Sequence, residues 1–434
     1  MTTAHKELFL KRGVDTIREL ETEKGILASG RSELYGCIFG RDSLITALKL
    51  LSFSEKSGDR AFLPLVKKIL VHLAALQGTS HVLESGEEPG KCIHEFRPDN
   101  HEHLTGHPER PWYLYPDNVM RNYDSVDSTP LFLIALGRYG EVSGDQEFLK
   151  EMRVYAERAL TWILEYGDKN GDGLIDYEFN PNRRGGGLTT QSWMDSGESL
   201  FHEDGSLIAY PVAPVEVQAY AYTALRIWQQ FFEVEGHMPR AAELRVRADL
   251  LKERFAALYP QQDEAGFFLA SAIDGNGKPL RSVRSSMGHL LWSAWKNGDG
   301  VIDSIISEEE IPLLVHRLMR PDLFEPGAGM RTLSTQSRLF ESNSYHNGSI
   351  WPHDTTMIAE GMERCGYRKE AGAIRMALAR GLAHFSSPVE LFVVGRDGVV
   401  EEYCSLSGQR ACLNQAWSAA SFLLLSLHQE YEEQ

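Results

Sequence analysis

The chain has 434 residues, of which 42% are hydrophobic and 24% charged, as is typical of a globular protein with a sizeable core. A formal net charge of −17 disfavours nucleic acid, anionic membranes and strongly anionic ligands, because binding a phosphate backbone requires clustered Lys and Arg. With no apolar window long enough for a transmembrane helix, no signal-peptide pattern and five scattered cysteines, we expect a cytoplasmic protein without a zinc site.

Amphipathic helical patterns dominate the chain. Apolar residues recur every three or four positions over 146–167, and residues 214–236 are apolar almost all round, as in a helix buried between other helices. Similar patterns occur at 41–54, 60–78, 128–144, 240–260, 353–385 and 415–434. Strand patterns are rare, with 389–395 among the few candidates. Since no linker or low-complexity tract divides the chain, we expect one domain over residues 1–434.

Loops rich in glycine, aromatic residues and carboxylates recur between the predicted helices. They span residues 35–43, 121–129, 189–199, 284–292, 342–354 and 387–398. This alternation predicts an all-α fold, an (α/α)6 toroid in which helical hairpins form a ring with a loop-lined pocket at one end. A solenoid of stacked repeats is the weaker alternative, because the chain has no fixed short period.

Two acidic loops near the N-terminus contain candidate sugar ligands. Arg41 and Asp42 lie at the start of a predicted helix, where Asp42 is either an N-cap or, with Arg41, a partner for vicinal sugar hydroxyls. Further on, Asp127 or Ser128 is expected to cap the next helix. Asp124 is then left without an obvious structural duty, which favours a ligand role for it.

The segment 168–178 is similar to a calcium-binding loop. Its EF-hand-like positions are filled by Asp168, Asn170, Asp172, Gly173 and Asp176. The closing position, normally glutamate, is Phe179, with Glu178 one place early. We therefore favour a tight turn at the Asn-Gly and Asp-Gly pairs, and calcium binding stays open.

The segment 188–199 contains Trp193, Asp195 and Glu198 among small polar residues. An indole beside Asp195 would lower the local polarity and raise the pKa of that carboxyl, as protonation of a glycosidic oxygen requires. The alternative is a turn in which Glu198 satisfies backbone amides.

Acid-assisted glycoside cleavage needs a second carboxylate across the scissile bond. The candidates are Glu390, in an apolar strand-like run, and Glu401 or Glu402 near a turn. We favour Glu390, because a charge among apolar residues is costly unless it is used or paired.

The loop 342–354 combines aromatic and polar side chains, namely Tyr345, His346, Asn347, Trp351, His353 and Asp354. Its two histidines are seven residues apart across a Trp-Pro pair, which is not a usual zinc spacing. Carbohydrate contact or a scaffolding role is therefore favoured over metal binding. His289 is expected to be a structural histidine.

Seven segments in this order resemble the α-1,6-glucosidase region of glycogen-debranching enzymes and their bacterial stand-alone relatives. They are "FGRDSLITALKLL", "NGDGLIDYE", "QSWMDSGES" followed by "DGS", "PVEVQAYAYTALR", "MGHLLW", "RTLS" followed by "SYHNGSIWPHD", and "NQAWSAASFLLL". The resemblance spans almost the whole chain. It implies an (α/α)6 barrel that hydrolyses a terminal α-linked glucose with inversion.

The resemblance also implies residue roles. The family's general acid, in a W-M-D segment, falls on Asp195, and its base, in a P-E-L segment before Q-A-W, falls on Glu390, although Val389 is an insertion. Related α-glucosidases have their base in an E-x-Y-x-x-x-T-G segment, which would fall on Glu401. The family's substrate-contacting Arg-Asp pair falls on Arg41 and Asp42, and the 345–354 segment falls on a wall of its sugar pocket.

We therefore expect an inverting exo-α-glucosidase that needs no cofactor or metal, with the α-1,6 branch stub of a glycogen-type glucan as its first candidate substrate. Because the chain has no room for the transferase domain of full debranching enzymes, a hydrolase of a small α-glycoside (glucosyl- or mannosylglycerate, or a disaccharide) is the alternative. A non-catalytic carbohydrate-binding toroid is the third reading. The aglycone and the oligomeric state stay open.

Besides the carboxylates Asp195 and Glu390 or Glu401, the candidate sugar contacts are Arg41, Asp42, Asp124, Trp193, Glu198, Tyr345, His346, Trp351, Gln415 and Trp417.

Overall fold

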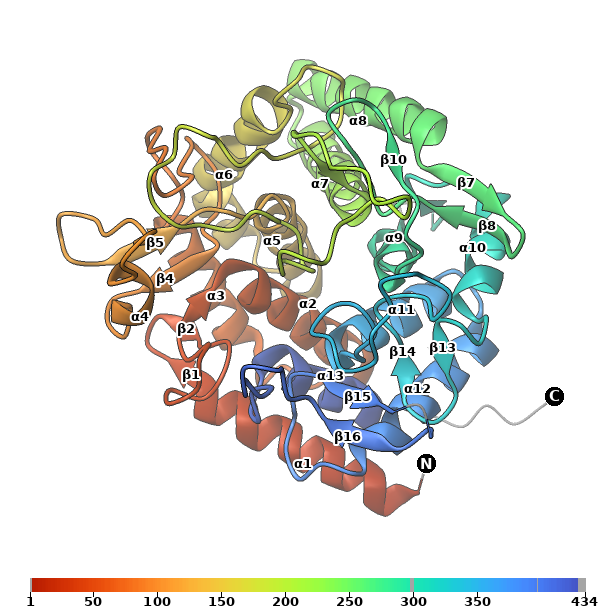
Figure 1. Ribbon diagram of the computed structural model, residues 1–434. Coiled ribbons are helices and arrows are strands. Elements are labelled where there is room, and N and C mark those ends of the chain that lie inside the picture. Colours follow the sequence, from red (N-terminus) through yellow and green to blue (C-terminus); the bar gives the residue numbers. More distant parts are fainter. Residues whose placement is uncertain (1, 297–299, 396, 428–434) are drawn as a thin grey trace.

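The computed structural model describes residues 2–296, 300–395 and 397–427, without the side chain of Lys296, and within these ranges it is a closed ring of helices (Figure 1). The inner ring contains α2 (Gly40–Ser57), α5 (Ser128–Ser143), α7 (Val215–Val234), α9 (His289–Ser293), α11 (Pro352–Arg364) and α13 (Ala416–Ser426). Each of these helices contacts the next, and α13 closes the ring against α2.

The outer layer alternates with the inner one along the chain. It contains α1 (Thr3–Leu20), α3 (Leu63–Ala75), α6 (Gln146–Thr161), α8 (Met238–Leu258), α10 (Glu310–Leu318) and α12 (Arg368–Leu382). Here α1 packs on α13, α3 on α2, α6 on α5, α8 on α7 and α12 on α11, while α10 packs against the strand β8 (Gly266–Leu269) and the 3₁₀ helix η2 (Ser285–Gly288). This alternation of inner and outer helices is the predicted (α/α)6 toroid.

Burial explains which helices lie inside. Almost every residue of α2 from Gly40 to Leu51 is buried, and the whole of α13 to Leu425 is buried, because both helices are covered on all sides. The outer helix α6 instead buries one face, and the Asp145 side chain caps it by accepting a hydrogen bond from Phe148 N at 3.1 Å.

Short strands and turns connect the helices. The paired strands are β1 (Glu21–Thr22) with β2 (Gly25–Ile26), β3 (Ile38–Phe39) with β4 (Glu95–Arg97) and β5 (Met120–Asn122), β6 (Ala213–Pro214) with β9 (Ala272–Ile273) and β10 (Pro279–Leu280), β7 (Pro260–Asp263) with β8 (Gly266–Leu269), β11 (Trp295–Lys296) with β12 (Ile302–Asp303), β13 (Phe324–Glu325) with β14 (Gly329–Met330), and β15 (Phe392–Val394) with β16 (Val400–Glu402). The short helices are α4 (Glu102–Thr105), the π-helix η1 (Trp162–Tyr166) and the 3₁₀ helix η2 (Ser285–Gly288).

Some local predictions differ from the structure. Residues 353–385 form two helices rather than one continuous stretch, because Gly366 adopts a left-handed conformation (φ +92°) between α11 and α12. Asp42 lies in the first turn of α2 and is not its N-cap, which is Phe39. Asp127 is the N-cap residue of α5, but its side chain makes no capping hydrogen bond. Across the described ranges, no helix combines the length and apolar character that a membrane span requires.

Candidate active site

A pocket lies at the end of the ring where inner helices begin. Arg41 and Asp42 open α2, and Trp351 and Gln415 are the N-cap residues of α11 and α13. The pocket is lined by Tyr35, Phe39, Arg41, Asp42, Trp193, Asp195, Tyr345, His346, Trp351, Glu390, Gln415 and Trp417. Residues from five separate loops thus meet in one place, including both favoured carboxylates.

Glu390 is held at the pocket wall by two hydrogen-bond donors. It lies just before β15, and only 2% of it is exposed. One carboxylate oxygen accepts a hydrogen bond from the Tyr345 hydroxyl, and the other accepts one from Cys412 N at 2.9 Å. Burial raises the pKa of Glu390 to about 7, against the lowering effect of these two donors. A carboxylate of this kind is a capable proton acceptor near neutral pH.

Asp195 faces the pocket beside a cation. Its side chain is 27% exposed, and Arg41 Nη1 donates a hydrogen bond to its Oδ2 at 2.9 Å. Burial raises the pKa of Asp195, while Arg41 opposes that shift. The guanidinium is shared, because Arg41 Nε also donates to Asp127 Oδ2 at 2.6 Å, deep below the pocket.

Asp42 and Gln415 form a second polar corner. The Gln415 side-chain amide donates to Asp42 Oδ2 at 3.0 Å. Burial, together with the nearby carboxylates of Asp195 and Glu390, raises the pKa of Asp42 to about 8. A carboxyl that holds a proton near neutral pH both donates and accepts hydrogen bonds, as recognition of sugar hydroxyls requires.

Aromatic rings build the remaining wall. His346 stacks on Trp351 with ring centroids 5.0 Å apart, and Trp193 meets Trp351 edge-to-face at 5.7 Å. Trp417 lines the same pocket. Such buried rings give a rigid apolar surface on which the C–H face of a sugar ring packs through many small contacts.

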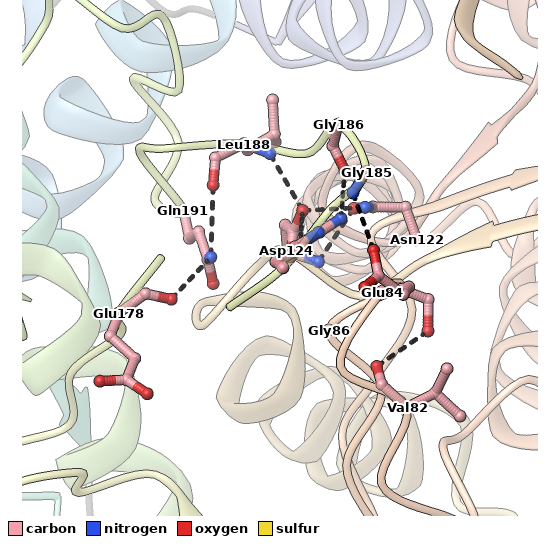
Figure 2. Close-up of polar contacts among 12 residues, drawn as sticks. Val82, Glu84, Gly86, Asn122, Asp124, Glu178, Gly185, Gly186, Leu188 and Gln191 are labelled. Carbon is pink, nitrogen blue, oxygen red and sulfur yellow. Dashed lines mark hydrogen bonds and ion pairs between the residues drawn. The ribbon is translucent and has the colours of Figure 1, made fainter. Parts of the chain in front are cut away.

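Asp124, a predicted sugar contact, does not line the pocket, and its carboxylate is engaged by other residues. Arg183 Nη1 donates to both of its carboxylate oxygens at 2.7 and 2.9 Å. Asn122 and the backbone N of Leu188 also donate to it, each at 2.9 Å (Figure 2). A Cβ at Gly187 would lie 2.4 Å from this carboxylate, so the glycine lets the loop approach its anchor. Asp124 therefore fixes the loop that leads to Asp195.

Glu198 and Glu401 also lie outside the pocket lining. Glu198 is exposed, and its backbone carbonyl accepts a hydrogen bond from the Asn347 side chain at 3.1 Å. Glu401 is exposed on β16, opposite Val393 of β15. Glu390, on the chain just before β15, reaches the pocket instead.

Sequence reasoning missed two pocket residues, Tyr35 and Phe39. Both belong to the aromatic loop 35–43 noted above, so their residue type was a usable signal. His289 proves to be a structural histidine, since it bonds Tyr220 at 2.6 Å and Asp354 at 2.8 Å below Trp193.

The described residues that could jointly hold a metal ion are remote from the pocket lining: Asp168, Asp172 and Asp176, whose oxygens lie within 4.8 Å of one another. His346 in the pocket instead shares a hydrogen bond with Ser196 Oγ at 2.8 Å.

Comparisons with known proteins identify the family and the fold. Residues 103–412 match the sequence profile of the mannosylglycerate hydrolase MGH1-like glycoside hydrolase domain. The crystal structure of the GH63 mannosylglycerate hydrolase from Thermus thermophilus in complex with Tris is similar, with a TM-score of 0.63 and 14% identity over 96% of this chain and 99% of that one. A rhamnosidase from Klebsiella oxytoca with rhamnose bound has a TM-score of 0.57 and 13% identity over 97% of this chain and 63% of that one.

The structural likenesses, at 13–14% identity, establish the toroid fold. The profile, which covers most of the chain, establishes the family, whereas the more specific resemblance to glycogen-debranching enzymes has no such support. The chain is a glycoside hydrolase that belongs to the mannosylglycerate hydrolase MGH1-like family.

Proposed function

We propose that this protein is an inverting hydrolase of a small α-glycoside, in which a single glucose or mannose enters the pocket. The observation that carries the proposal is the convergence of Asp195 and Glu390, two carboxyl groups with raised pKa, on one pocket. Paired carboxyl groups of this kind are the machinery of glycoside hydrolysis. The ring and both carboxylates come from one chain, which supports a single catalytic domain.

In the proposed mechanism, Asp195 protonates the leaving glycosidic oxygen. Glu390 takes a proton from a water molecule that attacks the anomeric carbon from the opposite face. Inversion requires a separation of roughly 6.5–9.5 Å between the two carboxyl groups, so that this water fits between them. Tyr345 orients Glu390, and Arg41 orients Asp195.

The sugar would be held by the other pocket residues. Asp42 and Gln415 would bond hydroxyl groups at the polar corner, and the rings of Trp193, Trp351 and Trp417 would pack against the pyranose. Arg41 has a smaller share in sugar binding than its position beside Asp42 suggested, because its guanidinium already bridges two carboxylates.

The family match supports a small substrate over a branched glucan. The matched family is described by its hydrolysis of mannosylglycerate, and crystal structures of the Thermus enzyme contain glucose, or Tris and D-glycerate. We therefore propose glucosyl- or mannosylglycerate as the substrate class, in place of the α-1,6 branch stub.

The test is sugar release from mannosylglycerate, glucosylglycerate, small α-glucosides and a limit dextrin, with the released anomer followed by NMR. The proposal expects turnover of a small glycoside with initial release of the β-anomer. Initial release of the α-anomer would refute inversion, and turnover of the limit dextrin alone would refute the substrate class. Asp195→Asn and Glu390→Gln serve as inactive controls.

A further inference from the structure

The turn that follows the π-helix η1 is fixed to the ring from two sides. The backbone N of Asp176 donates to Gly167 O at 2.8 Å, and Ile175 exchanges hydrogen bonds with the side chain of Gln218 in α7. Tyr177 then pairs with Val212. The long segment between Tyr177 and Val212, which contains Asp195, thus starts and ends at this turn.

Three carboxylates converge inside the turn. Asp168, Asp172 and Asp176 each offer an oxygen within 4.8 Å of those of the other two. Asp168 also accepts hydrogen bonds from the backbone N of Gly171 and Gly173, at 2.7 and 2.8 Å. These backbone bonds hold the first carboxylate in place, but they do not neutralise a cluster of three acidic groups.

A second observation shows that the cluster is incomplete. Asp176 is only 1% exposed, and its Oδ1 accepts a hydrogen bond from Lys169 N at 2.8 Å. Its other oxygen, Oδ2, is buried without a hydrogen-bond partner among the described residues. A buried carboxylate oxygen without a partner is costly, and native structures seldom retain one without a reason.

The neighbouring side-chain cations compensate this charge only in part. Arg247 Nη2 lies 3.7 Å from Asp168 Oδ2, and the Lys169 ammonium pairs with Glu88 instead. The site is therefore electron-rich and short of positive charge.

We propose that this turn binds a calcium ion through Asp168, Asp172 and Asp176. These residues occupy the first, fifth and ninth positions of an EF-hand-like loop, where Asn170 and the backbone carbonyl of Leu174 would supply the third and seventh. Oxygen donors of this kind suit a hard cation. The tight turn expected from the sequence is compatible with a bound ion, because the backbone hydrogen bonds to Asp168 shape the loop in either case.

Calcium binding at this turn is weak. The twelfth position, which gives EF-hands a bidentate glutamate, is Phe179. We therefore expect a dissociation constant of about 10⁻⁴–10⁻³ M, as in extracellular calcium modules. The ion's role is to stiffen the base of the segment that contains Asp195, and it takes no part in the chemistry.

The experiment is thermal unfolding of the full chain in EDTA and in CaCl2, with MgCl2 at the same concentration as a comparison. At a calcium concentration roughly ten times the dissociation constant, the melting temperature of the wild type should rise by about 1–3 °C. Calorimetric titration of CaCl2 into EDTA-treated protein should find one site. No calcium-dependent rise, or an equal rise with magnesium, would overturn the proposal.

Asp176→Asn gives the sharpest variant, because the amide keeps an oxygen for Lys169 N but removes the uncompensated charge. It should be at least as stable as the wild type in EDTA and should lose the calcium response. Asp172→Asn, which keeps an acceptor for Leu174 N, is the second variant and should also lose it. Retention of the calcium shift in both variants would contradict the assignment.

The matched control is Asp263→Asn, at the exposed end of β7. Asp263 Oδ1 likewise accepts a backbone hydrogen bond, from Ala265 N at 2.8 Å. This variant should keep the full calcium response. Since each readout is binding or stability, the outcome is independent of whether the proposed glycosidase activity is found.

Discussion

Tyr345→Phe tests whether Glu390 is the base, because it removes one of the two hydrogen bonds that its carboxylate accepts. Burial raises the pKa of Glu390 to about 7 although both donors lower it. A hydrogen bond to a buried charged group contributes about 1.5–3 kcal/mol, which corresponds to roughly one to two pKa units. Without the Tyr345 hydroxyl, the pKa of Glu390 should therefore rise by that amount.

A general base works only when it is deprotonated, so the activity of the wild type should fall as the pH drops below about 7. In Tyr345→Phe this acid limb of kcat/KM should move to higher pH by roughly one to two units, toward the lower figure if water replaces the hydroxyl. The assay is kcat/KM for the preferred glycoside, measured on both sides of neutrality.

Tyr403→Phe is the matched control for this shift. Its ring packs against that of Tyr345 with centroids 5.5 Å apart, but the Glu390 carboxylate accepts its hydrogen bonds from Tyr345 and Cys412 N. The acid limb should stay in place in this variant. A Tyr345→Phe enzyme that loses activity evenly at every pH, with an unmoved acid limb, would refute the reasoning that Glu390 is the titrating base.

Further predictions concern the other carboxylates. Asp195→Asn should lower kcat by about 10²–10⁴-fold with the melting temperature almost unchanged, and full activity in this variant would exclude Asp195 as the acid. Glu390→Gln should abolish turnover while Glu401→Gln stays active; the reverse result in the same assay would make Glu401 the base. Asp124→Ala should lower the free energy of unfolding by about 3–5 kcal/mol, measured with denaturant, because it leaves Arg183 buried and unpaired. Unchanged stability with a raised KM would restore a ligand role for Asp124.

The ring could be predicted because its signals are local. Helical periodicity is read within each segment, and the aromatic and acidic loops recur between the helices. Pocket residues such as Trp193 and Trp351 could be predicted for the same reason, because they lie in these aromatic and acidic loops. Where the chain bends at Gly366, periodicity continues across the break, so the local pattern predicts one helix where two exist.

Pairings between distant residues could not be predicted. No structural partner for Asp124 could be predicted from the sequence. In the structure its partner is Arg183, which is 59 residues away along the chain. Arg41 similarly reaches Asp195 across 154 residues. Neither pairing leaves a trace in local spacing or composition, so a carboxylate with a purely structural role and one with a catalytic role look alike in the sequence.

Asp127 bears on the acid role proposed for Asp195, because it pairs with the same arginine. A lone guanidinium at 2.9 Å would hold Asp195 ionised. Asp127, fully buried and only 2.6 Å from Arg41, takes up much of that positive charge, and its own charge raises the pKa of Asp195. Arg41 is thereby free to orient Asp195 without forcing its proton away. Burial remains the largest cause of the raised pKa of Asp195, and Asp127, a buried carboxylate that precedes a different helix of the ring, adds to it.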